Sequence, residues 1–256
     1  MHPADLSECT VSEPRPTPPQ LPEIAEHQWQ TWRDDRQRDL ASPFGNLALV
    51  ETRWLPDGER PDPGAVRPQL ADGVRVTTVQ RTDPATGVVE YALRRWDANS
   101  PAIQNFQYVE TFPYREDWVL EADYAPVQGA RRVPFEHIRD NGGTRDLAVP
   151  GDITLNIGGE PYTLSAFDDD GTLLLVFGDP TNGGVTYGAG RFLFVHRTEG
   201  EAGAQKVVLD FNRAFVPPCG FSDQYNCPMP PRQNRFHLPV EAGEKLPVFR
   251  DGFQEH

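Results

Sequence analysis

The 256-residue chain has no long apolar run and no excess of positive charge. None of its apolar stretches approaches the 18 or so residues that a membrane helix requires. Lys and Arg number 24 against 38 Asp and Glu, so the formal net charge is −14. A basic footprint is what neutralises the phosphates of nucleic acids, and this chain has none. We therefore expect a soluble, acidic protein that contacts neither membranes nor nucleic acids.

The N-terminus does not have the basic start and apolar core of a secretory signal. A cytoplasmic location is therefore expected. Residues 1–22 contain six prolines, which oppose both helix and sheet. We predict that this segment is a disordered tail.

Common reaction signatures are missing as well. The chain has no Gly-x-Ser-x-Gly elbow, no His-Glu-x-x-His pair, no Walker phosphate loop and no dinucleotide fingerprint. The sequence therefore names neither a reaction nor a cofactor, and whether the protein is an enzyme stays open.

One helix is predicted over residues 23–40, which lack proline and glycine. Ala25, Trp29 and Trp32 recur at helical spacing and indicate its buried face. The charged residues between 33 and 38, Arg36 among them, are expected to form the solvated face.

From Asn46 onward, short β-branched and aromatic runs alternate with Gly, Pro, Asn and Asp. This pattern predicts a mainly β fold, a single antiparallel barrel- or sandwich-like domain that spans residues 23–253 with its N-terminal helix. The clearest runs are 153–157, 160–167 and 172–177, connected by Gly158-Gly159 and an Asp-Gly turn. They predict a three-stranded meander, and a further strand is expected at 236–240.

The late part of the chain carries a specific resemblance. Its motifs are Phe177-Gly-Asp-Pro-Thr181, Thr186-Tyr-Gly-Ala-Gly-Arg191, Val208-Leu-Asp-Phe-Asn-Arg-Ala-Phe-Val-Pro-Pro-Cys219, Cys227-Pro-Met-Pro230, Asn234-Arg235 and Glu241-Ala-Gly-Glu-Lys245. This segment resembles the bacterial family called domain of unknown function 1684, and Trp32-Arg33-x-x-Arg36 fits the same family more faintly. The resemblance brings no established reaction.

Polar residues of the resembling segment suggest a pocket formed by late loops. We expect this pocket to bind a small molecule. Arg191 offers five fixed donors suited to a carboxylate or phosphate, so this molecule would be an anion if Arg191 faces the pocket. The alternative for Arg191 is an internal salt bridge to Asp179 or Asp210. The predicted ligand-binding set is Asp179, Tyr187, Arg191, Asp210, Asn212 and Asn234.

Cys219 and Cys227 lie in a loop stiffened by five prolines, and three interpretations stay open. A disulfide closing this loop would contribute on the order of 2.5 kcal/mol, but a reducing cytoplasm opposes it. Zinc lacks the usual ligand spacing, so no metal site is predicted. The third interpretation is a pair of buried thiols.

A second functional hypothesis is a non-enzymatic interaction or assembly module. It uses the same Pro-rich loop, whose rigidity lowers the entropy cost of binding, together with the aromatic residues Phe221 and Tyr225 exposed on its surface. Oligomeric state is not predicted.

Overall fold

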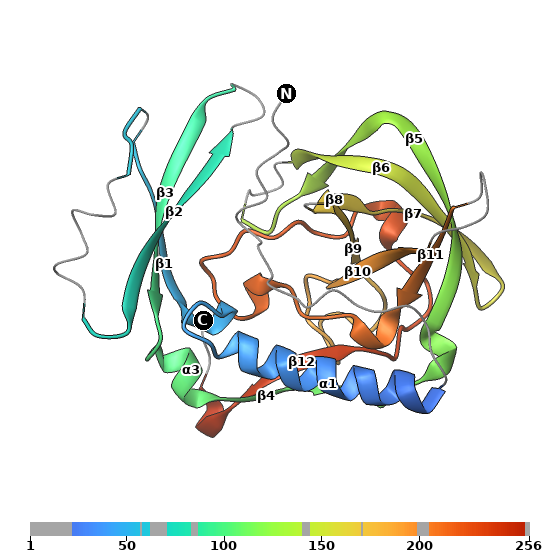
Figure 1. The fold of residues 1–256 in the computed structure, drawn as a ribbon, viewed down its shortest axis with the longest axis horizontal. Coiled ribbons are helices and arrows are strands. Elements are labelled where there is room, and N and C mark those ends of the chain that lie inside the picture. Colours follow the sequence, from blue (N-terminus) through green and yellow to red (C-terminus); the bar gives the residue numbers. More distant parts are fainter. Residues whose placement is uncertain are drawn as a thin grey trace.

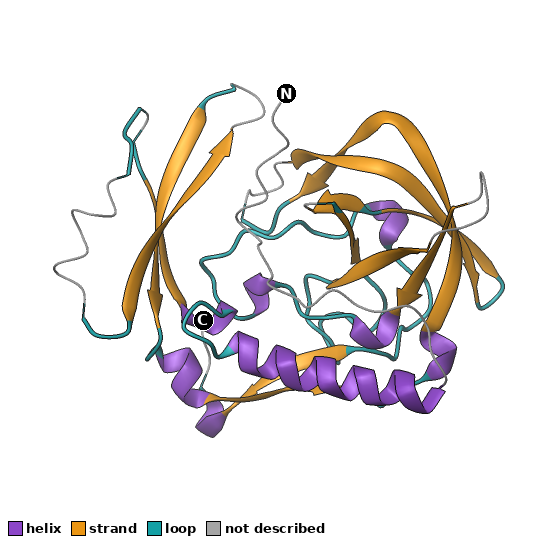
Figure 2. Cartoon of the chain, in the orientation of Figure 1, coloured by secondary structure: helices purple, strands orange, loops and turns teal. Residues whose placement is uncertain are grey.

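The computed structural model describes residues 22–56, 58–61, 71–82, 87–139, 144–169, 171–198 and 205–253. Apart from Pro22, the predicted disordered tail lies outside these residues. All strand pairs are antiparallel, and a long helix, α1 (Pro22–Leu40), precedes the strands (Figures 1 and 2). The predicted mainly β fold with one N-terminal helix is confirmed. Within the described residues, no helix is long and apolar enough to cross a membrane.

Helix α1 buries the side chains of Trp29, Trp32, Arg36 and Leu40, which recur every three or four residues and share one face. The predicted solvated position of Arg36 is wrong, because its side chain is 5% exposed. Its guanidinium instead forms a buried ion pair with Glu244, 2.8 Å from Nε to Oε1. The prediction was wrong because it used only the charge of Arg36. Its spacing from Trp29 and Trp32 places it on the buried face of the helix.

The largest sheet has seven strands in the order β7-β6-β5-β11-β10-β9-β8. Its edge strands β7 and β8 are consecutive in the chain and separated by Ala166 alone. The sheet therefore curls until its two edges approach each other, which gives the half-barrel seen in Figure 1. The strands are β5 (Val119–Glu136), β6 (Thr144–Ile157), β7 (Glu160–Ser165), β8 (Phe167–Asp169), β9 (Thr172–Phe177), β10 (Arg191–Thr198) and β11 (Gln205–Asp210).

The predicted three-stranded meander is wrong in one respect. The hairpin at Gly158-Gly159 joins β6 to β7 and the Gly171 turn joins β8 to β9, but β7 and β9 do not pair. The run at 160–167 is two strands, because the chain crosses from one sheet edge to the other at Ala166. Curling of the sheet overrides the local pattern.

Two smaller sheets flank the half-barrel. One has the order β1-β3-β2, with β1 (Leu49–Trp54), β2 (Val74–Thr82) and β3 (Val89–Asp97). The other pairs β4 (Phe106–Thr111) with β12 (Glu244–Phe249) beside α1, and the short helix α3 (Pro101–Asn105) precedes β4. The strand expected at 236–240 is not formed; the last strand lies at β12 instead.

Strand β9 of the half-barrel is buried on both faces. In β9, Leu173, Leu175 and Phe177 belong to one apolar cluster, whereas Leu174 and Val176 belong to a second one. The segment between β11 and β12 contributes to both clusters, through Phe236, Val240 and Ala242 to the first and through Phe215, Cys219, Tyr225 and Cys227 to the second. Strands buried on both faces read as continuous apolar runs, as β9 does.

Candidate functional site

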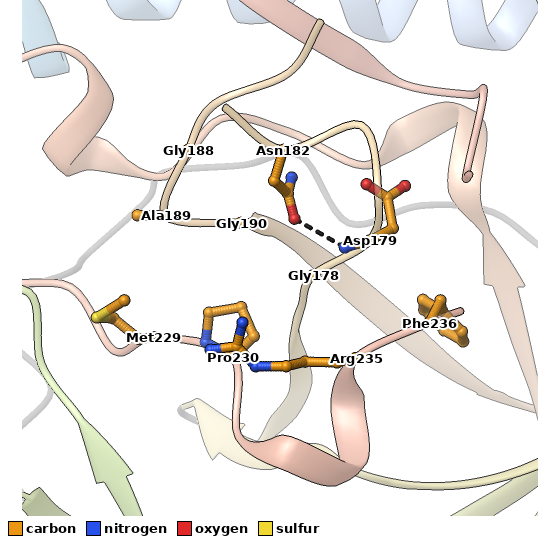
Figure 3. A pocket seen from close by; sticks show the side chains of 10 residues that line it. All are labelled: Gly178, Asp179, Asn182, Gly188, Ala189, Gly190, Met229, Pro230, Arg235 and Phe236. Carbon is orange, nitrogen blue, oxygen red and sulfur yellow. Dashed lines mark hydrogen bonds between the residues drawn. The ribbon is translucent and has the colours of Figure 1, made fainter. Parts of the chain in front are cut away.

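Two late loops enclose a pocket of about 360 Å³. One loop connects β9 to β10, and the other lies at residues 229–236 (Figure 3). We call it the late-loop pocket, and its lining residues are Gly178, Asp179, Asn182, Gly188, Ala189, Gly190, Met229, Pro230, Arg235 and Phe236. Of the six predicted ligand-binding residues, Asp179 lines this pocket and the other five do not.

Asp179 is saturated by internal hydrogen bonds. Its Oδ1 accepts from the backbone N and the hydroxyl of Thr181, and its Oδ2 accepts from Arg191 Nη2 at 3.0 Å and from Val240 N at 2.7 Å. Four donors fill the carboxylate and an arginine balances its charge. The side chain therefore holds the fold together at the edge of the pocket.

Arg191, at the start of β10, is entirely buried and faces residues 240–244, a segment that we call the strap. Its guanidinium donates to Asp179 and to the carbonyl oxygens of Val240, Ala242 and Glu244. Burial lowers the pKa of Arg191 to about 10, although Asp179 opposes this shift. The structure realises the internal salt bridge with Asp179, one of the alternatives that the sequence left open.

A second buried ion pair anchors the same strap. Glu244 Oε1 accepts from Arg36 Nε of α1, and Glu244 Oε2 accepts from the backbone N of Val216 at 2.7 Å. Gly243 permits the tight path between the two pairs: its φ is +81°, and a Cβ there would stand 2.5 Å from the Ala214 carbonyl oxygen. The family-like motifs at Arg36 and at 241–245 thus meet in a structural contact.

Asn234 joins the edge strand β7 to β9, the strand next to the other edge of the curled sheet. Its Oδ1 accepts from Ser165 N at 2.9 Å, and its Nδ2 donates to Ser165 O and Val176 O, each at 2.8 Å. Ser165 ends β7 and Val176 belongs to β9, so one carboxamide supplies the hydrogen bonds that a neighbouring strand would make. Asn234 is fully buried and does not face the pocket.

The Asn212 carboxamide likewise pairs with the backbone of a distant segment, and Asp210 lies beside it. Its Oδ1 accepts from Arg115 N at 2.9 Å, and its Nδ2 donates to Arg115 O at 2.8 Å. Asp210 caps this turn by accepting from Asn212 N, and it pairs with Arg213. Burial raises the pKa of Asp210, while hydrogen bonds from Asn212 and the charge of Arg213 oppose the increase.

The partly buried Tyr187 and the two buried cysteines form a separate group. The Tyr187 hydroxyl donates to the Cys219 carbonyl oxygen at 3.0 Å, and burial raises its pKa. Cys219 and Cys227 are free thiols, 2% and 1% exposed. Among the described residues, no cluster of three or more His, Cys, Asp and Glu could hold a metal ion. Of the three interpretations of the cysteine pair, the structure therefore shows the pair of buried thiols.

The Pro-rich loop is packed into the fold. Pro217, Pro218, Pro228 and Pro230 are buried. Phe221 and Tyr225, which the interaction-module hypothesis needs at the surface, are 0% and 2% exposed. Their predicted exposure is wrong, because both rings pack against apolar clusters beneath the loop.

The remaining pocket wall was not predicted. Asn182 Oδ1 accepts from Asp179 N at 2.7 Å and shapes one side, while Pro230 and Arg235 lie opposite (Figure 3). Gly190 fits because its φ is +93° and a Cβ would stand 2.5 Å from Pro230 Cγ. The signal for Arg235 was its place next to Asn234 in a family-like motif, but sequence cannot tell which of the two side chains turns outward.

The fold and this site define a class: an antiparallel half-barrel protein with a loop-built pocket beside a buried ionic strap. The chain belongs to the family described as Protein of unknown function (DUF1684), which matches residues 104–245. No curated protein matches the chain.

A solved structure has a similar fold, the solution NMR structure of the uncharacterized protein from gene locus rrnAC0354 of Haloarcula marismortui. The two chains are 23% identical, and the comparison covers 87% of this chain and 95% of that one with a TM-score of 0.51. At this identity the likeness shows the fold alone.

Proposed function

We propose that the protein binds a small anionic molecule in the late-loop pocket, with Arg235 as its charged anchor. The observation that carries this proposal is an exposed guanidinium at the pocket wall that the fold does not use. Within the described part of the chain, Arg235 makes no side-chain hydrogen bond and no ion pair.

The charge of the pocket supports an anionic ligand. Asp179 and Arg235 are the formally charged residues among the ten that line it. The carboxylate of Asp179 is balanced by Arg191, 3.0 Å away, so the positive charge of Arg235 is left over. A guanidinium can grip a carboxylate or a phosphate through two parallel hydrogen bonds.

The opposite wall offers backbone donors. Gly188 and Ala189 line the pocket, and their amide nitrogens donate no hydrogen bond to any residue that the structure describes. Successive free N–H groups in a glycine-rich turn are suited to bind anion oxygens. The volume of about 360 Å³ is at the lower end of the range for small-molecule sites, which favours a compact ligand.

Thermal unfolding with inorganic phosphate, pyrophosphate and malonate tests the proposal, with glucose as the neutral comparison. A ligand that binds the folded state raises its melting temperature with concentration. We expect at least one anion to raise the melting temperature of the wild type, and Arg235→Gln to remove most of that shift. Arg232→Gln is the matched control, because Arg232 is exposed on the same loop but does not line the pocket.

Two results would contradict the proposal. One is equal stabilisation of the wild type and of Arg235→Gln by the same anion, which would place binding elsewhere. The other is the absence of any shift with all three anions in the wild type.

A further inference from the structure

We propose that Cys219 and Cys227 form a dithiol that hydrogen peroxide oxidises to an intramolecular disulfide, with Cys219 as the attacking thiol. This site is distinct from the late-loop pocket and uses neither Arg235 nor its anion. A failure of one proposal therefore leaves the other intact.

The geometry brings the two sulfur atoms together. The backbone N of Cys219 donates to Cys227 Sγ at 3.4 Å, so the Cys227 sulfur lies against the backbone of Cys219. The 3-10 helix Pro218–Gly220 fixes Cys219, and a hydrogen bond from Ile138 N to Cys227 O at 3.0 Å fixes the other end. Both cysteines are thus held in contact by the surrounding backbone.

The surroundings favour Cys219 as the nucleophile. Burial tends to raise the pKa of its thiol, but the neighbouring Cys227 and Tyr187 side chains and the charge of Arg139 outweigh burial, so the pKa is lowered. The thiolate is the reactive form, and a lower pKa makes it more abundant at neutral pH. The Tyr187 side chain is held beside Cys219 by the hydrogen bond that its hydroxyl donates to the Cys219 carbonyl oxygen at 3.0 Å.

Because both thiols are buried, only a small oxidant can reach them in the folded protein. The side chains of Cys219 and Cys227 lie in an apolar cluster with Phe215 and Tyr225, and almost none of their surface is open to solvent. A tripeptide disulfide such as oxidised glutathione is too large to reach either sulfur without loop opening. Hydrogen peroxide is close to water in size and needs no such opening.

The chemistry balances in two steps. The Cys219 thiolate attacks one peroxide oxygen, the O–O bond breaks, and the departing hydroxide takes up the proton released by Cys219 and leaves as water. Cys219 is then a sulfenic acid. The Cys227 sulfur attacks the Cys219 sulfur, an S–S bond forms, the S–O bond breaks, and hydroxide leaves as a second water with the Cys227 proton. Two thiols and one peroxide give one disulfide and two waters.

The test begins with the reduced full-length protein. Folded protein is exposed to hydrogen peroxide, quenched and unfolded, its remaining thiols are alkylated, and its peptides are mapped by mass spectrometry. We expect a peptide that links Cys219 to Cys227 and has lost two hydrogen atoms, and dithiothreitol restores both thiols. Alkylation of both cysteines after peroxide treatment of the wild type would overturn the proposal, whatever the variants do.

Variants assign the roles. In Cys227→Ser, dimedone is expected to trap a sulfenic acid at Cys219, whereas in Cys219→Ser the residue Cys227 stays unlabelled. Dimedone labelling of Cys227 but not of Cys219 would overturn the assignment. Cys9→Ser is the matched control, because it removes the third cysteine and is expected to leave the disulfide unchanged.

Two further measurements separate a poised thiol from a merely buried one. Tyr187→Phe is expected to slow disulfide formation roughly threefold, since a less stabilised thiolate is less abundant. Oxidised glutathione at the same concentration is expected to leave the folded wild type reduced. Disulfide formation as fast with glutathione as with peroxide would contradict the small-oxidant requirement.

Discussion

Arg191, which binds the strap, and Arg235, which lines the late-loop pocket, have opposite surroundings. Arg191 is fully buried and donates to one carboxylate and three carbonyl oxygens. Arg235 is exposed, and its guanidinium has no partner among the described residues. The same functional group is thus a structural tie in one place and a candidate ligand anchor in the other. What separates them is whether the fold itself supplies acceptors to the guanidinium.

The largest effect is expected from breaking the strap. Arg191→Met leaves Asp179 charged and unpaired in a buried position and leaves three carbonyl oxygens without their donor. Removal of one partner of a buried ion pair costs about 3–5 kcal/mol. Chemical denaturation of the variant is expected to show a loss of that size in the free energy of unfolding.

Arg197→Met provides the control for this substitution. Arg197 lies on the same strand, β10, but is exposed and contacts Tyr124 only through its ring face at 5.3 Å. Its loss is expected to cost less than about 1 kcal/mol. A similar loss in the free energy of unfolding for both variants would mean that the buried Arg191–Asp179 pair stabilises the fold no more than an exposed arginine does.

Asn234→Ala is expected to have the next largest effect. It leaves the N–H and carbonyl of Ser165 and the carbonyl of Val176 without their side-chain partner, all in buried positions. Unsatisfied buried groups cost about 1–3 kcal/mol each, and partial rearrangement limits the total to about 2–4 kcal/mol. Urea unfolding measures it.

The neighbouring Gln233→Ala is the matched control for Asn234. Gln233 is exposed and reaches Ser165 Oγ only at 3.4 Å. We expect the free energy of unfolding of Gln233→Ala to stay within about 0.5 kcal/mol of the wild-type value. If Asn234→Ala were equally mild, the carboxamide would not be what joins β7 to β9.

Local pattern predicted most of the strands but not how they close. The two hairpins at Gly158-Gly159 and Gly171 follow from turn chemistry, whereas next to the crossing at Ala166 the backbone N of Ser165 donates to Asn234, far along the chain. Long-range contacts of this kind leave no periodic signal. The predicted site residues are polar in sequence, and their partners are mostly backbone groups of other segments, so the sequence could not show that Arg191 and Asn234 are already satisfied.

A smaller effect is expected from a group whose charge the fold disfavours. Burial, and then the nearby charge of Arg213, lower the pKa of His196 from 6.5 to about 4. Between these values the unfolded chain takes up a proton that the folded chain does not, so the free energy of unfolding falls as the pH falls. Because His196 is partly exposed, we expect about 1–2 kcal/mol of loss from this residue.

His196→Gln isolates this contribution. Titrating carboxylates, Asp210 included, remain in both proteins, so the difference between their stability curves reports on the histidine. We expect the variant to lose less stability than the wild type between pH 6.5 and 4, with equal slopes above pH 7. Parallel curves over the whole range would show that His196 is as free to protonate in the folded state as in the unfolded chain.

The smallest change in stability is expected from the loss of Arg235, and it tests most directly how Arg235 differs from Arg191. Because Arg235 is exposed and unpaired within the described residues, Arg235→Ala is expected to change the free energy of unfolding by less than about 0.5 kcal/mol. The same variant is expected to lose the anion-dependent rise in melting temperature, measured with phosphate alongside the unmodified chain. A residue that costs nothing to remove and yet controls binding is retained for its ligand, whereas a loss of several kcal/mol would make Arg235 a second structural tie like Arg191.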